Sequence, residues 1–163
     1  MWFVWAPASP AQAYEDLTSL DAEFSYAHAF ADEAPRHGAA LGLGASLGLD
    51  EVLSVRGQFA WALHPDTAGN LSVLLLSAEL LYLIDVLEIV PYFGAGVDGL
   101  GTWAAGESIQ ADFGVHPVLG FDWLLSREFA LGIQLRPVFV LTQLDAWPVY
   151  FKAGVSVSYF FEL

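Results

Sequence analysis

The stretch FGVHPVLGFDWLLSREFALGIQLRP, residues 113–137, alternates large apolar residues with small or polar ones on both sides of a break at Ser126-Arg127-Glu128. One face holds Phe113, Val115, Leu119, Phe121, Trp123, Phe129, Leu131, Ile133 and Leu135, and the other holds Gly114, His116, Gly120, Asp122, Gly132, Gln134 and Arg136. Such alternation indicates β-strands, because successive side chains of a strand point to opposite faces. The stretch therefore predicts two antiparallel strands joined by a tight turn.

The same alternation recurs along most of the chain. It predicts eight strands, at residues 21–31, 39–50, 53–64, 72–85, 89–98, 113–123, 129–139 and 149–161. The segment 72–85 is apolar on both faces, and there we place Leu74, Leu76, Leu80 and Tyr82 on the outer face, with Ser77 and Glu79 on the inner one.

The connections between these strands are of two kinds. Three are tight, at 50–51, 85–88 and 126–128, and four are longer, at 32–38, 65–70, 99–110 and 141–147. Short turns at one end and longer loops at the other are typical of barrels that cross the outer membrane of bacteria. The expected fold class is all-β: an eight-stranded antiparallel up-and-down transmembrane β-barrel with short periplasmic turns and both termini in the periplasm.

The composition agrees with a membrane environment. Of the 163 residues, 56% are hydrophobic and 15% charged, against about 25% charged in ordinary soluble proteins. The longest apolar run, 71–87, is interrupted by Ser77, Glu79 and Asp85, so no segment offers the roughly 20 apolar residues of a spanning helix. Two candidate folds remain: a closed barrel in lipid and an apolar soluble barrel.

The distribution of side-chain size favours the lipid barrel. A soluble lipocalin-type barrel would hold its large apolar side chains inside, whereas here the face opposite them carries Gly, Ala, Ser and a few charges, which suits a crowded eight-stranded interior. Aromatic residues gather toward the strand ends, as in the two girdles of a membrane barrel. These are Phe30, Trp61, Tyr82, Trp123, Phe129, Phe139, Phe151 and Tyr159.

Charge and cysteine content exclude several classes of function. The net charge is −14 with only five Lys and Arg, which disfavours nucleic acid as a partner because phosphate binding needs a basic face. The chain has no cysteine, so disulfides and thiolate metal sites are excluded.

The first residues, MWFVWAPASPAQA, end in Ala11-Gln12-Ala13 and precede the acidic Tyr14-Glu15-Asp16. The small-x-small pattern is that of an export cleavage site, although a disordered N-terminus is the alternative. We expect residues 1–13 to be the tail of a signal peptide whose beginning lies upstream, and residues 14–163 to be the barrel domain.

Three segments resemble the small eight-stranded outer-membrane barrels of the OmpA/OmpX and OmpW kind: VPYFGAGVDG at 90–99, the stretch 113–137, and KAGVSVSY at 152–159. The resemblance covers residues 20–163 and implies an integral outer-membrane protein. The last segment is similar to the C-terminal assembly signal that the outer-membrane insertion machinery binds, which would assign this role to Lys152, Gly154, Val157 and Tyr159. Four residues, FFEL, follow Tyr159, and Phe161 offers an alternative terminal aromatic in the same phase.

The inner face carries a set of charged and titratable residues. These are Glu23, Arg56, Glu79, Asp98, His116, Asp122, Arg136 and Lys152. If the hairpin pairs His64 with Leu71, Arg56 lies directly opposite Glu79. A gated proton or ion path is one interpretation, but we favour a static plug of paired charges, because a buried charge is costly unless it is paired.

The sequence offers little for catalysis or for a cofactor. His28 is the one titratable residue on the predicted lipid face, and Ser25 lies on the opposite face of the same strand, so the two cannot form a hydrolase pair. A girdle histidine is the better interpretation. His37 and His64, with Asp32, Glu33 and Asp66, would hold a cation only weakly, so we predict no metal site and no cofactor.

The leading hypothesis is a non-enzymatic outer-membrane protein with a structural or surface-contact role. A narrow channel for small or hydrophobic solutes is the first alternative, and a lipid-modifying enzyme is the second. The expected partners are outer-membrane lipids and the insertion machinery, with any surface partner left open, because this fold hosts many functions.

Overall fold

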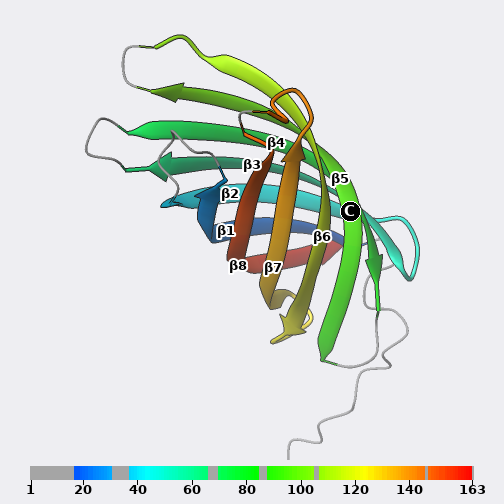
Figure 1. Ribbon diagram of the computed structural model, residues 1–163. Coiled ribbons are helices and arrows are strands. Elements are labelled where there is room, and N and C mark those ends of the chain that lie inside the picture. Colours follow the sequence, from blue (N-terminus) through cyan, green and yellow to red (C-terminus); the bar gives the residue numbers. More distant parts are fainter. Residues whose placement is uncertain are drawn as a thin grey trace, which may run out of the picture.

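In the computed structural model, residues 17–30, 37–65, 70–84, 88–104, 107–145 and 147–162 are described, and they form a closed barrel of eight antiparallel strands in chain order (Figure 1). The strands are β1 (Leu17–Ala29), β2 (His37–Gly48), β3 (Leu53–His64), β4 (Leu71–Leu83), β5 (Ile89–Ala104), β6 (Gln110–Leu124), β7 (Phe129–Val140) and β8 (Val149–Glu162). The described ranges contain no helix capable of crossing a membrane. The expected export tail, 1–13, lies outside them.

The predicted number, order and pairing of the strands are confirmed. β1 pairs with β8 and closes the barrel, and Leu17 lies opposite Glu162, so both described chain ends lie at one end of the barrel. This end also carries the tight turns, and we call it the turn end; the opposite end, with the connections that follow β1, β3, β5 and β7, is the loop end (Figure 1).

The prediction of a loop at 99–110 is wrong over most of its length. β5 continues to Ala104 and β6 begins at Gln110, and Gly99, Gly101 and Thr102 pair with residues of β6. The glycines suggested a turn, but inside a barrel the ladder supplies a partner for their backbone groups, and this tertiary pairing overrides local propensity. The first strand also begins earlier than predicted, at Leu17 instead of residue 21.

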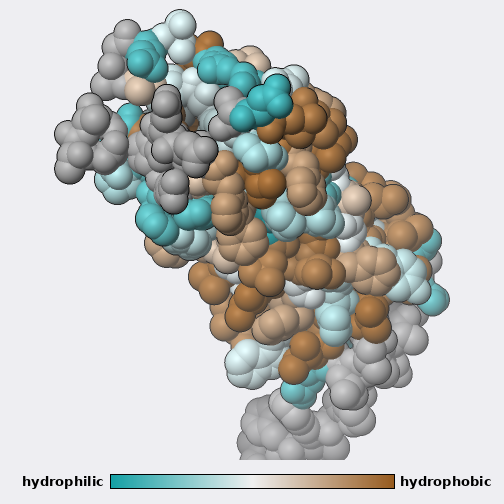
Figure 2. Space-filling view, viewed as in Figure 1, coloured by the Kyte–Doolittle hydropathy of each residue, from teal (hydrophilic) through white to brown (hydrophobic). Residues whose placement is uncertain are grey.

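The outer surface is apolar around the middle of the barrel. Figure 2 shows this as brown hydrophobic surface across the body, with hydrophilic residues concentrated toward the ends. Leu43, Leu76 and Leu119 are 66, 65 and 59% exposed although they lie mid-strand. The predicted phase of 72–85 is confirmed, since Ser77 and Glu79 are buried while Leu76, Leu80 and Tyr82 are exposed.

The interior is more apolar than predicted and forms three layers. An apolar layer fills the loop end: Ala27, Ala29, Ala40, Ala60, Ala62, Val73, Leu75, Leu100, Val138, Val140 and Tyr150. A second apolar layer lies toward the turn end: Leu81, Leu83, Val90, Tyr92, Val118, Ala130 and Phe160. Polar and charged side chains lie between the two. Alternation assigns an inward phase to residues such as Ala27, Ala29 and Tyr92, but it does not show that the inward apolar residues group into layers.

The ladder between β6 and β7 has one gap. Val115 pairs with Phe139 and Leu119 with Leu135, but no pairs form between these positions. This register places Pro117 opposite Pro137, and proline has no N–H to donate to a ladder. The wall of the barrel is therefore least tightly bonded at this point.

Candidate functional site

Glu79 is the centre of the polar layer. Its Oε2 accepts a hydrogen bond of 2.8 Å from Arg56 Nε and lies 2.6 Å from Arg56 Nη2. Its Oε1 lies 2.5 Å from Arg136 Nη2 and 3.1 Å from His116 Nε2. The register pairs His64 with Leu71 and Arg56 with Glu79, as the sequence analysis expected. Glu79 is 3% exposed, so this carboxylate depends on three partners from different strands.

A second carboxylate, Glu23 on β1, organises the other half of the layer. Lys152 Nζ lies 3.1 Å from Glu23 Oε1, an ion pair outside hydrogen-bond geometry. Glu23 Oε2 accepts hydrogen bonds from the side-chain amides of Gln58 and Gln134. Gln134 also accepts a hydrogen bond of 2.9 Å from Arg56 Nη2, so it joins the two halves into one network.

His116 and Asp98 complete the network. Asp98 makes a short contact with His116 Nδ1 and accepts a hydrogen bond of 2.5 Å from Ser77 Oγ. His116 therefore lies between the carboxylates of Asp98 and Glu79. The network as a whole contains three cationic side chains, Arg56, Arg136 and Lys152, and three carboxylates, those of Glu23, Glu79 and Asp98. Its formal charge is zero when His116 is neutral.

Two glycines leave the space that these side chains occupy. A Cβ on Gly96 would lie 2.7 Å from the Cε1 and Nε2 atoms of His116, which faces it across β5 and β6. A Cβ on Gly154 would lie 2.7 Å from Glu23 Oε1. The inward glycines thus have a packing role at the charged layer.

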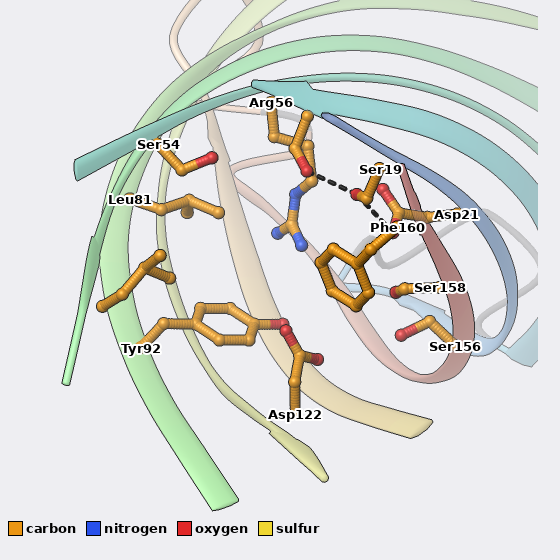
Figure 3. A pocket seen from close by; sticks show the side chains of 12 residues that line it. Ser19, Asp21, Ser54, Arg56, Leu81, Tyr92, Asp122, Ser156, Ser158 and Phe160 are labelled. Atoms are coloured by element: carbon orange, nitrogen blue, oxygen red, sulfur yellow. Dashed lines mark hydrogen bonds between the residues drawn. The ribbon is translucent and has the colours of Figure 1, made fainter. Parts of the chain in front are cut away.

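A small polar pocket lies below this layer, toward the turn end (Figure 3). Its polar lining consists of Ser19, Ser46, Ser54, Ser156, Ser158, Asp21, Asp122, Tyr92 and Arg56. Ser19 donates a hydrogen bond of 3.1 Å to Asp21 and shares one of 2.5 Å with Ser46. The guanidinium carbon of Arg56 lies 5.4 Å from the centre of the Tyr92 ring. The pocket has a volume of about 30 Å³, enough for a few water molecules and not for a larger solute.

The predicted interior residues are thus brought together with one exception. Glu23, Arg56, Glu79, Asp98, His116, Arg136 and Lys152 belong to the network, whereas Asp122 lines the adjoining pocket, which it shares with Arg56. The sequence analysis also missed Gln58 and Gln134 as members. Their inward phase was a usable signal, but only the structure shows that their amides reach Glu23.

The five residues of the proposed assembly signal fall on two faces of β8. Lys152 and Gly154 face the interior, while Val157 and Tyr159 are exposed on the outer surface. The Tyr159 ring lies 5.2 Å from Phe129 and 6.0 Å from Phe161, centre to centre, at the turn end.

The histidines at the loop end differ from expectation. His37 belongs to β2 and lies directly opposite His28 on β1, whereas it was expected in a loop. His64 is fully buried, and its Nε2 lies 3.0 Å from the hydroxyl of Tyr150, so a shared surface with His37 is excluded. Asp32, Glu33 and Asp66 lie outside the described residues. Ser25 is buried and cannot reach His28 on the outer face.

Known structures share this architecture. The structure of Neisserial surface protein A superimposes with a TM-score of 0.76 at 15% identity, covering 87% of this chain and 96% of that one. The chain has the fold of the small eight-stranded outer-membrane barrels. The outer membrane protein OprG of Pseudomonas aeruginosa gives 0.65 at 13% identity over 92% of this chain and 98% of that one.

A further neighbour within this fold is Ail, the attachment invasion locus protein of Yersinia pestis, with a TM-score of 0.62 at 13% identity over 90% of this chain and 99% of that one. No family model matches the sequence, and no curated protein does. At these identities the likeness concerns the fold and leaves the function to be argued from the chain's own residues.

Proposed function

We propose that this chain is an integral protein of the bacterial outer membrane with a structural or surface-contact role and a lumen closed to solutes. The observation that carries the proposal is the inverted distribution of side chains: leucines and aromatics are exposed around the middle, while Arg136 and Lys152 are each 1% exposed. In water this arrangement would expose far more apolar surface than a monomer usually shows. In lipid it is the expected one.

Three layers in series support a closed lumen. An ion entering from the loop end would meet a packed apolar layer that includes Leu75 and Tyr150, and would lose its hydration there. It would then meet the charged network, whose cations and anions are already paired. We therefore expect purified protein to show no steady single-channel level in a planar bilayer, with a known porin as the positive control. A reproducible open level would instead support the narrow channel.

Two of the structural neighbours are named as a surface protein and an attachment protein, which supports the surface-contact role. A partner of this chain should not be a polyanion. Three of its five Lys and Arg lie in the interior network, which leaves Arg36 and Arg127 for the rest of the molecule. We expect no retention on heparin at physiological salt.

The non-enzymatic part of the proposal has its own test. Ser25 and His28 lie on opposite faces of β1, so these two residues do not form the serine-histidine pair of a lipid hydrolase. Expression in a bacterium with a defined lipid A should leave the lipid A mass unchanged. A loss of one acyl chain would favour the lipid-modifying alternative.

The orientation follows from the same proposal. The tight turns and both chain ends would lie in the periplasm, and the loops outside the cell. An epitope inserted at Asp50-Glu51, in the turn between β2 and β3, should be inaccessible to antibody on intact cells and accessible after permeabilisation. Labelling of intact cells would reverse the assignment.

A further inference from the structure

Two histidines and a tyrosine lie together on the outer face of β1 and β2, at the loop end. His28 and His37 are directly opposite each other in the register, and Tyr26 precedes His28 by two residues on the same face. Tyr26 is 44% exposed, and His37 is exposed as well. These side chains belong neither to the interior network nor to the pocket, and the proposed function does not use them.

The polar atoms of this group converge on one point. The Tyr26 hydroxyl oxygen lies 3.2 Å from His28 Nδ1 and 2.5 Å from His37 Nδ1. The two imidazole rings are 4.8 Å apart between centres and inclined at 52°. A hydroxyl donates only one proton, so it can satisfy one Nδ1 as a donor, and the other Nδ1 must donate to it. Two nitrogen ligands and one oxygen ligand therefore share a small volume.

Imidazole and phenolate are ligands for divalent transition metals. Zinc holds nitrogen and oxygen ligands at about 2.0–2.2 Å, which places neighbouring ligand atoms of a tetrahedral site about 3.3 Å apart. The 3.2 Å between the tyrosine oxygen and His28 Nδ1 matches this value, whereas the 2.5 Å to His37 Nδ1 is shorter. A rotation that moves the His37 ring away from the tyrosine oxygen would open the group around an ion. Copper(II) binds such nitrogen and oxygen donors more strongly than zinc does.

We propose that His28, His37 and Tyr26 form a surface site for a divalent transition-metal ion, Cu²⁺ or Zn²⁺, at the loop end of the barrel. Three protein ligands leave a coordination position for water or for a group from outside. The net charge of −14 favours a cation near the molecule. Within the described ranges, no three His, Cys, Asp or Glu side chains gather as a metal cluster, and here the third donor is a tyrosine oxygen.

The other histidines of the chain provide an internal contrast. His116 is held between Asp98 and Glu79 in the charged layer, and His64 is fully buried beside Tyr150. An ion in solution reaches neither without opening the barrel. A stoichiometry of one ion per chain is therefore expected from His28 and His37 alone.

The experiment uses the folded barrel in detergent micelles, with any affinity tag removed, and measures Cu²⁺ and Zn²⁺ binding separately by equilibrium dialysis. Wild-type protein should bind one ion per chain, and bound Cu²⁺ should show coupling to two imidazole nitrogens in its paramagnetic resonance spectrum. His28→Ala and His37→Ala should each weaken binding by roughly tenfold or more. Tyr26→Phe should weaken it less and remove any phenolate-to-copper absorption band.

Tyr82→Phe is the matched control, because Tyr82 is an exposed outer tyrosine next to Phe93, away from any histidine on the described strands. It should bind metal as wild type does. Mobility shifts on heating report that each variant is folded. The proposal fails if wild-type protein shows no saturable binding, or if the double variant His28→Ala with His37→Ala binds as tightly as wild type. Resonance spectra with oxygen ligands only would also overturn it.

Discussion

Arg56 on β3 and Glu79 on β4 are direct neighbours in the ladder, and their side chains meet inside the barrel through a 2.8 Å hydrogen bond and a 2.6 Å ion contact. Glu79 also contacts Arg136 and His116, whereas Arg56 reaches on to Gln134. The pair is thus the junction of a network that extends around most of the barrel, and the two partners are not equivalent.

This asymmetry predicts the outcome of a double-mutant cycle. Glu79→Ala leaves two buried arginines without their main partner and should destabilise the folded barrel by about 3–5 kcal/mol. The double variant Arg56→Ala with Glu79→Ala should recover part of this loss but not all of it, because Arg136 stays uncompensated. Urea unfolding in micelles measures both. Strictly additive effects would mean that the two side chains are not coupled.

Two glycines on β5 give a matched test of interior packing. A Cβ on Gly96 would lie 2.5 Å from the Ala78 carbonyl oxygen and 2.7 Å from His116, while a Cβ on Gly99 would meet no atom within 4 Å. Gly96→Ala should therefore destabilise the barrel by about 1–3 kcal/mol through overpacking. Gly99→Ala should be neutral or slightly stabilising, since alanine restricts the unfolded chain. Equal effects of the two changes would contradict the described interior.

If the outer face contacts lipid, the cost of placing an arginine there should depend on how deep the position lies in the bilayer. Leu43 lies mid-strand on β2, and Leu49 lies beyond the end of β2, and both are more than half exposed. Leu43→Arg should cost about 2–4 kcal/mol and Leu49→Arg only about 0–1 kcal/mol, because the cost falls toward the membrane interfaces. Folding into vesicles under varied urea measures the difference. A similar cost at both sites would mean that no bilayer surrounds the strand.

The gap in the β6–β7 ladder predicts that restoring the missing backbone N–H donors will raise the free energy of unfolding. Pro117→Ala together with Pro137→Ala returns two N–H groups to facing positions of the ladder, and each new hydrogen bond should add about 0.5–1.5 kcal/mol. Hydrogen exchange should show the new amides of residues 117 and 137 to be protected. Rapid exchange at both new amides would show that this seam is open for a reason other than proline.

Most of this fold could be predicted from the sequence, because lipid-facing apolar residues alternate with small or polar inward-facing residues along the strands of a membrane barrel. Period-two alternation predicts that Leu43 and Ile133 face outward. The position of one hairpin predicts that Arg56 pairs with Glu79. What it missed depends on neighbours distant in sequence. Leu75 and Tyr150 share the inward phase of their strands, but their large apolar side chains are of the kind that faces lipid, and only the structure shows the interior layer to which they belong.

The outer histidines show the same limit. Whether His37 meets His28 depends on the length of the connection between β1 and β2, and one residue more or less in that pairing would move one ring to the interior. Gly99 and Gly101 were misassigned to a loop because their composition suggests a turn, whereas the long β5–β6 hairpin accommodates them. In each case the deciding contact is set by register and not by the residue itself.

The C-terminal strand carries a prediction for assembly. Tyr159 is exposed on the outer face, with Phe129 and Phe161 on either side, which is the place of a girdle aromatic. If 152–159 is the segment that the insertion machinery binds, Tyr159→Ser should lower the heat-modifiable fraction in the outer membrane of cells. The same variant refolded from urea into micelles should keep nearly the folded yield of wild type, because the Tyr159 side chain makes mainly surface contacts. Phe161→Ser is the comparison: a larger cellular defect there would make Phe161 the terminal aromatic of the signal. Equal loss in cells and in micelles for Tyr159→Ser would point to a folding role and away from recognition.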